Sequence, residues 1–497
     1  MTGYLLGVDA GHTLLKATLF DTRGRTVGGG VRPLDALRPR PHWQERDMNV
    51  TWRAAAAVIA DALADAGVPA VSVQAVGLAG HGDGTYLVDG NGRAVRPGIL
   101  ATDSRAAGYR AAWKADPAAG RLLDLAGQTP EPYAPAAILT WLRDHEPESL
   151  DRATHLLFCK DWIRLRLTDT IATDPTDAAA GLCDIRTRRW SAETLGIYGL
   201  SELSRLLPPI RPSDFVIGSI TPTAAAQTGL AAGTPVITGS HDVHSAALGI
   251  GALTDGALSS ILGTFNINQV ATTTPRPSRS WQTRCSITDH LYLSMATSPA
   301  GAAAMDWVRA ITNLTAQPLT TTVGRSLSTP ITADDPMFLP FVHGSRLDPD
   351  IGGAFLGLGG WHDPHDLLRA ALEGVVFEHR VHLTALAPLS RTPDTVRLTG
   401  GGSRSTEWCQ LFADVTGLRV QVTDTHEAGA RGAAMLAGIG IGQLGDHRDA
   451  ARRWVNVIRE HHPQASRTLL INSRFERWES AIKALQNAAE SSVANDG

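Results

Sequence analysis

Cysteine is scarce in this chain, and its few copies lie far apart. Cys159, Cys183, Cys285 and Cys409 form no Cys-x-x-Cys pair among the 497 residues. A disulfide framework would need a dense, regular set of cysteines, and a structural zinc site would need ligand pairs a few residues apart. The spacing therefore predicts neither a disulfide-stapled fold nor a zinc-binding module.

Long apolar runs and a strong charge of one sign are also missing. The chain has no stretch of about 18 apolar residues, and it opens as a strand rather than as a basic segment followed by an apolar one. Its net charge of −4 lacks the basic excess that nucleic-acid binding requires. We therefore expect a cytoplasmic protein with no membrane and no nucleic-acid partner.

The composition that remains is that of a large globular protein. Apolar residues make up 43% and charged residues 19% of the chain. A chain of this length exceeds what one hydrophobic core usually holds, so two domains are expected. A glycine-rich stretch over residues 249–255 resembles a seam between two halves. It predicts domains at residues 1–249 and 250–497.

The first half opens with Gly7–Asp21, GVDAGHTLLKATLFD, which predicts two strands joined by a tight turn. Gly11 allows the backbone to approach a ligand closely, so backbone N–H groups and the Thr13 hydroxyl could bind phosphate oxygens. Asp9, at the end of the first strand, is an acceptor suited to hydrated magnesium. The alternative is an ordinary hairpin, in which Asp9 is only a turn residue.

The second half begins in the same way. A strand over 257–262 is followed by a turn at Gly263 and Thr264 and by a second strand over 265–270. This echo of the opening hairpin indicates an internal repeat of layout, although the two sequences are not alike.

Other loops with chemical potential follow predicted strands. The strand 74–79 leads into GHGDG at residues 80–84, and the strand 234–239 leads into Ser240-His241-Asp242 and a small-residue helix. A strand over 396–398 opens onto Gly400–Ser403, ahead of a helix over 406–416. A glycine-rich loop before a helix N-terminus is a favourable binding site for the phosphate or ribose of a nucleotide. The remaining local expectations are a helix over 50–66 that ends at Gly67 and turns at 21–24 and 28–30.

Four of these segments resemble the FGGY family of carbohydrate kinases, whose relatives include glycerol kinase and xylulose kinase. The segments are DAGHTLLK, GSHDVHSAALG, GAFLGLGGWHDPHDLLRAALEG and GGGSRSTEWCQLFADVTG, in that order along roughly residues 4–442. The resemblance implies an α/β protein with a duplicated, two-domain actin-like ATPase (ribonuclease H-like) fold that binds ATP between its domains. It also implies ATP and Mg²⁺ as cofactors and a sugar or polyol as substrate. Members of the family often form homodimers.

The resemblance assigns a role to each candidate residue. Asp242 matches the catalytic base, with a simple helix cap as the alternative, and Asp9 matches a magnesium ligand. His12 stands where the family usually has a threonine, so one hydroxyl contact is replaced or lost. The ATP-binding set is Gly11, His12, Thr13, Lys16, Gly263, Thr264, Gly400, Gly401, Gly402 and Ser405.

The predicted sugar-side residues are His81, Asp83, Asp103, Tyr133 and Asp242. Asp83 falls where glycerol kinase has a glutamate and xylulose kinase a histidine, and a carboxylate can accept two hydroxyl hydrogen bonds. Tyr133 resembles an aromatic residue beside the glycerol site. His241 and His244 flank Asp242 and are expected to support it rather than to bind a metal.

The segments HGDGTYLVD, FCKDWIRLRLT and ATDPTDA look most like erythritol kinases and L-xylulose kinases. We therefore expect transfer of the ATP γ-phosphoryl group to a terminal hydroxyl of an open-chain four- or five-carbon polyol or ketose. D-xylulose and glycerol are the alternative substrates. Outside this class, the alternatives are an actin/Hsp70-like ATPase and a non-catalytic sugar sensor.

Overall fold

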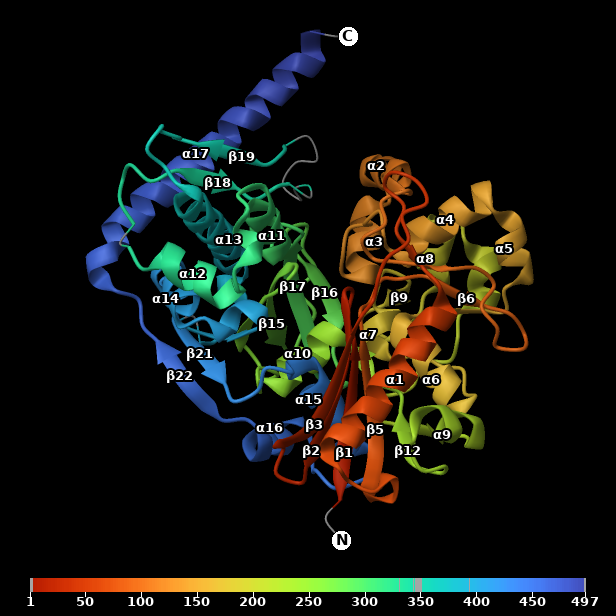
Figure 1. Cartoon of the computed structure of the whole chain (residues 1–497). Helices are drawn as coiled ribbons and strands as arrows, with labels where there is room; N and C mark the ends of the chain where they lie inside the picture. Colours follow the sequence, from red (N-terminus) through yellow and green to blue (C-terminus); the bar gives the residue numbers. More distant parts are fainter. Residues whose placement is uncertain (1–2, 330, 343, 345–350, 393, 496–497) are drawn as a thin grey trace. The chain divides into compact units, whose positions relative to one another are not determined.

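The computed structural model describes residues 3–329, 331–342, 344, 351–392 and 394–495, and it divides into two compact units (Figure 1). The first unit combines Met1–Thr254, Ala271–Ser294 and Glu427–Val455, and the second combines Asp255–Val270, Met295–His426 and Asn456–Gly497. Each unit is therefore built from segments that are far apart in the sequence.

The first unit is organised around a seven-stranded sheet. Its strand order is β11-β12-β5-β1-β2-β3, and β13 also pairs with β5. The first hairpin is antiparallel, whereas β1, β12 and β13 run parallel to β5. The strands are β1 (Tyr4–Ala10), β2 (Leu14–Asp21), β3 (Thr26–Pro33), β5 (Val73–Gly80), β11 (Val216–Ser219), β12 (Pro235–Ile237) and β13 (Ser240–His241).

Short strand pairs and a set of helices complete this unit. The pairs are β4 (Glu45–Arg46) with β7 (Gly98–Ile99), β6 (Tyr86–Val88) with β8 (His155–Leu157), and β9 (Cys183–Asp184) with β10 (Arg189–Trp190). The helices are α1 (Met48–Ala66), α2 (Ala107–Ala115), α3 (Ala119–Ala126), α4 (Pro135–His145), α5 (Pro147–Arg152), α6 (Cys159–Thr168), α7 (Pro175–Ala178), α8 (Ala192–Ile197), α9 (Pro222–Thr228), α10 (Asp242–Gly249), α15 (Ala428–Gly440) and α16 (His447–Trp454). Two 3₁₀ turns, Ala70–Ser72 and Ser201–Leu206, link them.

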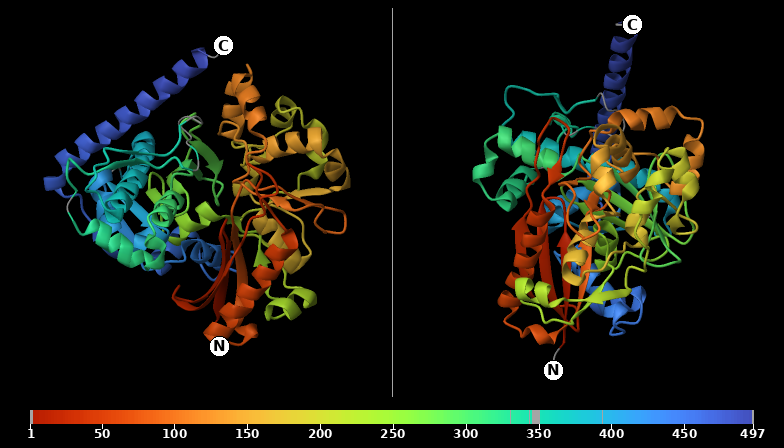
Figure 2. Two further views of the ribbon diagram at one scale, coloured as in Figure 1. Left: turned by 45° about the horizontal axis from the view of Figure 1, so that its top comes forward. Right: turned by 90° about the vertical axis from the view of Figure 1, so that its right-hand side faces the viewer.

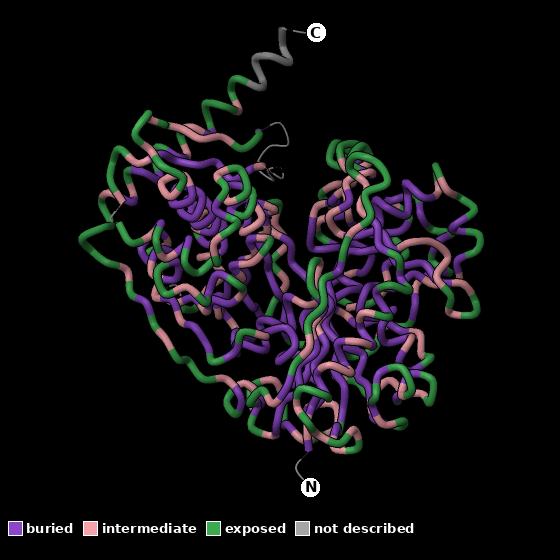
Figure 3. The backbone as a smooth tube through the Cα atoms, in the orientation of Figure 1, coloured by how far each residue is buried: buried purple, intermediate pink, exposed green. Residues whose placement is uncertain are grey.

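Helices α1 and α15 pack on opposite faces of the sheet. On β1, Leu6 and Val8 point into the apolar core shared with α1, whereas Gly7 points at α15. A Cβ at Gly7 would lie 1.8 Å from the carbonyl oxygen of Ala430, so the strand and the helix backbone are nearly in contact. The central strands β1 and β5 are buried along most of their length, and purple marks buried backbone in Figure 3. The alternation of side chains along β1 thus fixes which helix covers which face.

The expected turn at residues 28–30 was wrong, because these residues lie inside β3. The glycines at 28 and 30 allow close packing of α1 on the strand, and they do not form a turn. A Cβ at Gly28 would lie 2.5 Å from the backbone nitrogen of Ala66, and one at Gly30 would lie 2.5 Å from the carbonyl oxygen of Val58. Both positions lack a side chain because α1 crosses the strand there. The predicted helix end at Gly67 is confirmed, with a left-handed φ of 61°.

The second unit is organised around the sheet of order β16-β17-β15-β14-β20-β21-β22. Its edge strand β16 (Gln282–Cys285) belongs to the segment that is counted with the first unit. The other strands are β14 (Leu258–Leu262), β15 (Asn266–Thr272), β17 (Tyr292–Ser298), β20 (Thr395–Thr399), β21 (Arg419–Thr423) and β22 (Val457–His461), with a separate pair β18 (Met337–Leu339) and β19 (Ala354–Leu356).

Its helices are α11 (Ala302–Ile311), α12 (Leu319–Leu327), α13 (Pro364–Leu386), α14 (Thr406–Thr416) and α17 (Ala465–Asn495), with 3₁₀ turns at Leu314–Ala316, Ala387–Leu389 and Gly401–Arg404. Asp363 caps α13 and forms a reciprocal capping box with Asp366. Figure 2 shows α17, in blue, as one long continuous helix. Among the described residues, no helix has the length and apolar character needed to cross a membrane.

The two sheets share one layout, as the repeated hairpin predicted. In each sheet an antiparallel hairpin, β1–β2 or β14–β15, is followed by a parallel partner of its first strand, β5 or β20. Another parallel strand comes next, β12 or β21, and an antiparallel edge strand, β11 or β22, closes the series. This is the duplicated two-domain α/β fold that the resemblance implied.

Candidate active site

Four candidate residues of the first unit, Asp9, His81, Asp83 and Asp242, lie at the carboxyl ends of three neighbouring parallel strands. Asp9 lies near the end of β1, His81 and Asp83 follow β5, and Asp242 follows β13. The backbone N–H of His81 donates to the carbonyl oxygen of Ala10 at 2.9 Å, which joins the first two strand ends. Crevices at this end of α/β sheets are where ligands usually bind.

Asp242 is the first residue of α10, and His241 before it takes the cap position, so Asp242 is not the helix cap that the sequence left open. Burial and the negative charge of Asp9 raise its pKa well above the usual value, with smaller contributions from Asp177 and Asp83. A carboxylate with a raised pKa is a stronger proton acceptor. His241 Nε2 lies 3.2 Å from Asp242 Oδ1, and burial together with Arg284 keeps the pKa of this imidazole well below its usual range.

Asp83 has an unusual backbone conformation, and its carboxylate is paired with a buried arginine. Its φ is 62°, a left-handed value that is uncommon outside glycine. Arg284 Nη2 donates to both carboxylate oxygens of Asp83 at 2.8 Å, and Arg284 Nε donates to Gln128 Oε1 at 3.2 Å. Strained residues of this kind persist where the surroundings fix them, and they cluster at ligand sites. The carboxylate that was expected to accept sugar hydroxyls therefore already has an arginine partner.

Arg284 also connects other predicted residues to this cluster. Its Nη1 lies 3.5 Å from His241 Nδ1, and its Nη2 donates to Gln282 Oε1 at 3.2 Å. Gln282 Nε2 in turn lies 3.5 Å from the Tyr133 hydroxyl. Sequence reasoning missed Arg284, because β16 carries no recognisable motif and lies 201 residues from Asp83.

The histidine that replaces the usual threonine faces a second histidine. The rings of His12 and His81 stack with centroids 4.3 Å apart, and His81 Nε2 lies 3.1 Å from the Tyr86 hydroxyl. Burial lowers the pKa of His12 to about 4, helped by Arg46, and lowers that of His81 well below its usual value. Both rings are therefore neutral at pH 7 and offer hydrogen bonds without adding charge.

A buried ionic cluster anchors the strand before Asp242. Lys160 Nζ lies 2.7 Å from Asp161, 3.0 Å from Asp174 and 2.9 Å from Asp177, and all four side chains are fully buried. The Thr176 hydroxyl donates to Asp174 at 2.7 Å and accepts from the backbone N–H of His241 at 2.8 Å. The segments FCKDWIRLRLT and ATDPTDA thus act together to position the start of α10, a link that sequence order alone did not reveal.

Asp9 has the properties expected of a magnesium ligand. Its Oδ1 is buried without a hydrogen-bond partner in the described part of the chain, and burial raises its pKa to about 6 although Lys16 opposes this. Mg²⁺ in proteins is typically bound through one or two carboxylates, water and substrate phosphates. Among the described residues no group of three or more histidine, cysteine or acidic side chains could hold a metal by itself. Asp9 therefore fits a hydrated ion shared with a nucleotide.

Two predicted residues have other partners. Lys16 Nζ lies 2.8 Å from Glu427 Oε2 and is only partly exposed, so its charge is already paired. Asp103 is fully buried, and its carboxylate accepts from the Gln44 backbone N–H at 2.6 Å and from the Arg105 side chain. Asp103 stabilises that loop, and these hydrogen bonds do not connect it with Asp242.

In the second unit, the glycine loops also meet at one end of the sheet. Gly263 and Thr264 follow β14, Gly400 follows β20, and these neighbouring strands run parallel. Gly400 has a φ of 93°, and a Cβ there would lie 2.6 Å from the Leu262 carbonyl oxygen, so only glycine fits. The Ser405 hydroxyl caps α14 by accepting from the Trp408 N–H at 3.1 Å.

The buried His244 of α10 should make the stability of the protein depend on pH. It is fully buried, and burial, with Arg284, lowers its pKa to about 3, so the folded state excludes a proton that the unfolded chain binds below about pH 6.5. Stability from this group is present above pH 6.5 and is lost as the pH falls. Relative to His244→Gln, the wild type should lose about 1.2 kcal/mol more unfolding free energy between pH 6 and 5.

The measurement is urea unfolding of both proteins at pH 7.5, 6 and 5. His42→Gln, at an exposed histidine, controls for the substitution itself. Parallel pH dependences of the wild type and His244→Gln would show that His244 is not held neutral.

Comparison with known proteins places this geometry in a family. Residues 4–249 match the N-terminal domain, and residues 258–441 the C-terminal domain, of the FGGY family of carbohydrate kinases. An L-xylulose/3-keto-L-gulonate kinase of Escherichia coli is 32% identical over 490 residues, 98% of each chain. A xylulose kinase of Escherichia coli is 30% identical over 441 residues, 87% of this chain and 89% of the relative.

The solved structures agree with the sequence matches. The crystal structure of a xyloylose kinase from Brucella ovis has a TM-score of 0.85 and 28% identity, over 98% of this chain and 100% of that one. The predicted family, fold and kinase class are confirmed, which sets aside the ATPase and sensor alternatives. The chain belongs to the FGGY family of carbohydrate kinases, phosphotransferases that use ATP and an alcohol group as acceptor.

Proposed function

We propose that this kinase phosphorylates a terminal hydroxyl of a neutral, open-chain four- or five-carbon ketose or polyol. L-xylulose is the first candidate and erythritol the second. The relative named for L-xylulose covers 98% of this chain, whereas the xylulose kinase of the same organism covers 87%. D-xylulose and glycerol remain the alternatives within the class.

The charge around Asp242 carries the preference for a neutral sugar. Arg284 is a buried cation of this cluster, and its charge is already paired with that of Asp83. Burial raises the pKa of Asp242, and the negative charges of Asp9, Asp177 and Asp83 raise it further, so an added carboxylate would meet these charges here. A sugar acid such as 3-keto-L-gulonate would add another carboxylate, and repulsion from the carboxylates of this cluster would weaken its binding. We therefore favour L-xylulose over the acid that the relative's name also contains.

In the proposed reaction, Asp242 accepts the proton of the attacking hydroxyl. ATP supplies the γ-phosphoryl group, and Mg²⁺ would neutralise its charge. The neutral His241 imidazole lies against the Asp242 carboxylate and would keep it oriented. Sugar hydroxyls would be bound by His81, Tyr133 and the Asp83–Arg284 pair.

The remaining candidates are proposed for the nucleotide. Asp9 would hold Mg²⁺, and the Thr13 and Thr264 hydroxyls would contact phosphate oxygens, each at the turn of its hairpin. The glycine loop that begins at Gly400 would accommodate the nucleoside. Lys16 would contribute charge only if its pair with Glu427 opens. The supporting nucleotide-side positions are Gly11, His12, Gly263, Gly401, Gly402 and Ser405.

The test is a coupled ADP-release assay with Mg–ATP. The panel contains L-xylulose, D-xylulose, erythritol, both erythruloses, both ribuloses, xylitol, ribitol, glycerol and 3-keto-L-gulonate. We expect one neutral sugar to reach a kcat/KM of about 10⁴ M⁻¹s⁻¹ or more, the ordinary range for enzymes. A higher value for 3-keto-L-gulonate than for every neutral sugar would refute the charge argument while leaving the kinase class intact.

Arg284→Lys should weaken sugar use selectively. Lysine keeps the positive charge but loses the planar fork that binds Asp83 and Gln128 together. Losing one buried charged hydrogen bond corresponds to about 10- to 100-fold in kcat/KM for the sugar. The KM for ATP should change less than about twofold, because the arginine contacts none of the proposed nucleotide residues. Steady-state kinetics with each substrate varied in turn measures both effects.

Arg205→Lys is the matched control for this variant. Arg205 also donates to two partners, the carbonyl oxygens of Ala153 and Leu150, and neither of these residues belongs to the Asp242 cluster. Equal losses of sugar and ATP efficiency in Arg284→Lys would contradict a sugar-side role.

A further inference from the structure

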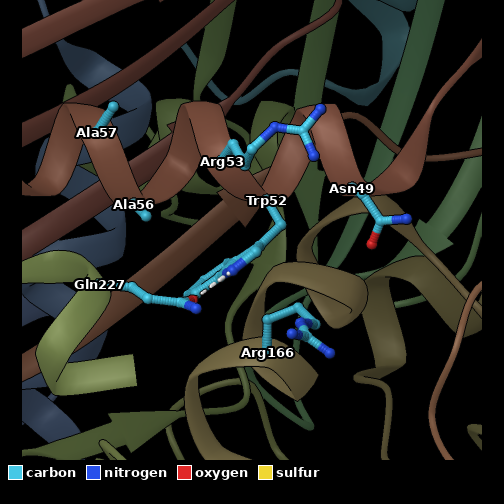
Figure 4. A pocket seen from close by; sticks show the side chains of 7 residues that line it. All are labelled: Asn49, Trp52, Arg53, Ala56, Ala57, Arg166 and Gln227. Atoms are coloured by element: carbon cyan, nitrogen blue, oxygen red, sulfur yellow. Dashed lines mark hydrogen bonds between the residues drawn. The ribbon is translucent and has the colours of Figure 1, made fainter. Parts of the chain in front are cut away.

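A pocket separate from the Asp242 cluster lies between three helices of the first unit. Its volume is about 560 Å³, and it is lined by residues of α1, α6 and α9 (Figure 4). The side chains that matter for the argument are Asn49, Trp52, Arg53, Arg166 and Gln227. None of them belongs to the proposed sugar or nucleotide sets. A volume of this size is in the range of small-molecule sites.

The polar groups of this pocket present hydrogen-bond donors. Trp52 Nε1 donates to Gln227 Oε1 at 2.8 Å, drawn as a dashed line in Figure 4. Because the amide oxygen of Gln227 already has this partner, its NH₂ group is the part that remains for a ligand. The guanidinium of Arg166 lies 5.5 Å from the Trp162 ring and 5.9 Å from the Trp52 ring, which limits its freedom. Its Nε is buried and has no hydrogen-bond partner among the described residues.

The charge of this pocket is positive and unbalanced. No acidic side chain lines it, and across the described residues no ion pair is formed by Arg53 or Arg166. The nearby helix cap, Asp47, uses its carboxylate to accept from the N–H groups of Asn49 and Val50. Two arginines without an ion pair among the described residues therefore line one pocket of a chain whose net charge is −4. Such a local excess attracts an anion.

We propose that this pocket binds a phosphoryl dianion, carried by a small phosphate monoester or as free phosphate. Arg53 on α1 and Arg166 on α6 line the same pocket, guanidinium groups favour phosphoryl oxygens, and the Gln227 NH₂ adds a neutral donor. A carboxylate would supply one negative charge and two oxygens, so it would leave one arginine unbalanced. The volume exceeds what free phosphate fills, which leaves room for the organic part of an ester.

Isothermal titration calorimetry on the full chain tests this proposal. The probes are glycerol 3-phosphate, inorganic phosphate, glycerol and lactate, each titrated into the wild type, Arg53→Gln and Arg166→Gln. We expect saturable binding of at least one phosphate probe, with a Kd at least about 10-fold weaker in each variant, because each variant removes a charged hydrogen bond. Lactate and glycerol should bind at least about 10-fold more weakly than the phosphate probe. A comparison of the two phosphate probes tells whether the ester or the free ion is the better ligand.

The controls separate this pocket from the catalytic cluster. Arg38→Gln, at an exposed arginine outside the pocket, should leave the Kd unchanged. Sugar kcat/KM should remain within about twofold of wild type in Arg53→Gln, because Arg53 is exposed on the surface of α1. Arg166 packs on two tryptophans, so the melting temperature of its variant is compared with wild type, and Arg53→Gln remains informative if that variant unfolds. Absence of phosphate binding, or an equal Kd in Arg53→Gln and Arg38→Gln, would overturn the proposal.

Discussion

Asp242→Asn is expected to lower kcat by about 10²- to 10⁴-fold, the usual loss when a general base is removed. Asparagine has nearly the same shape as aspartate but cannot accept the hydroxyl proton. In the folded protein, burial and Asp9 disfavour the charged form of Asp242, as its raised pKa indicates. Removing the charge relieves this repulsion, so the variant should be at least as stable as the wild type.

The combination of lost activity and retained stability distinguishes a catalytic role from a structural one. Turnover is measured with saturating sugar and Mg–ATP, and the melting temperature by thermal unfolding. Asp214→Asn is the control. Burial also raises the pKa of Asp214, but Asp214 is not among the groups that shift the pKa of Asp242. Near-normal turnover of Asp242→Asn, or a large fall in its melting temperature, would contradict the assignment.

Gly432→Ala should be among the most destabilising single-methyl additions in the first unit. A Cβ at this position of α15 would lie 1.8 Å from the carbonyl oxygen of Ser245 on α10, and backbone cannot rotate away as a side chain can. Overpacking of this kind typically costs about 1–3 kcal/mol and more where neighbours cannot yield, so we expect about 3 kcal/mol or more. Because α10 begins at Asp242, catalysis should fall with stability.

Gly108→Ala is the matched control for this effect. Gly108 lies in α2, and a Cβ there would meet nothing within 4 Å. Alanine is favoured over glycine in a helix by up to about 1 kcal/mol, so this variant should be neutral or slightly stabilised. Thermal unfolding of the two variants gives the comparison, and equal melting temperatures would rule out the close contact between α10 and α15.

Local patterns predicted the elements of the fold well, because their causes are local. The hairpin at the N-terminus, its echo at β14–β15 and the helix stop at Gly67 all follow from neighbouring residues. Glycine was the main source of error. It marks both turns and close backbone contacts, and at residues 28–30 only the crossing of α1 decides between the two.

The partners of the candidate residues could not be predicted from the sequence, for a different reason. Asp83 and Asp242 could be recognised from family segments, but what neutralises or confines them comes from remote parts of the chain. Arg284 is 201 residues from Asp83. Lys16 and Glu427 pair although they lie in the first and last segments of the first unit. Ser405 was predicted for the nucleotide from its position, whereas its hydroxyl caps α14, a use that the sequence pattern fits equally well.

The discontinuity of the first unit has a consequence for how the chain is made. Helix α15 packs against β1 and β5 but lies at residues 428–440, so the ribosome has translated most of the chain before this helix emerges. Until then, the face of the sheet at Gly7 and Gly77 has no helix to cover it, and exposed apolar sheet surface promotes aggregation. A truncated gene that ends near residue 254 would encode the whole N-terminal family domain, residues 4–249, but it would lack α15, the helix that covers this face of the sheet. Such a fragment should need a chaperone, or the missing segment supplied in trans, to stay in solution.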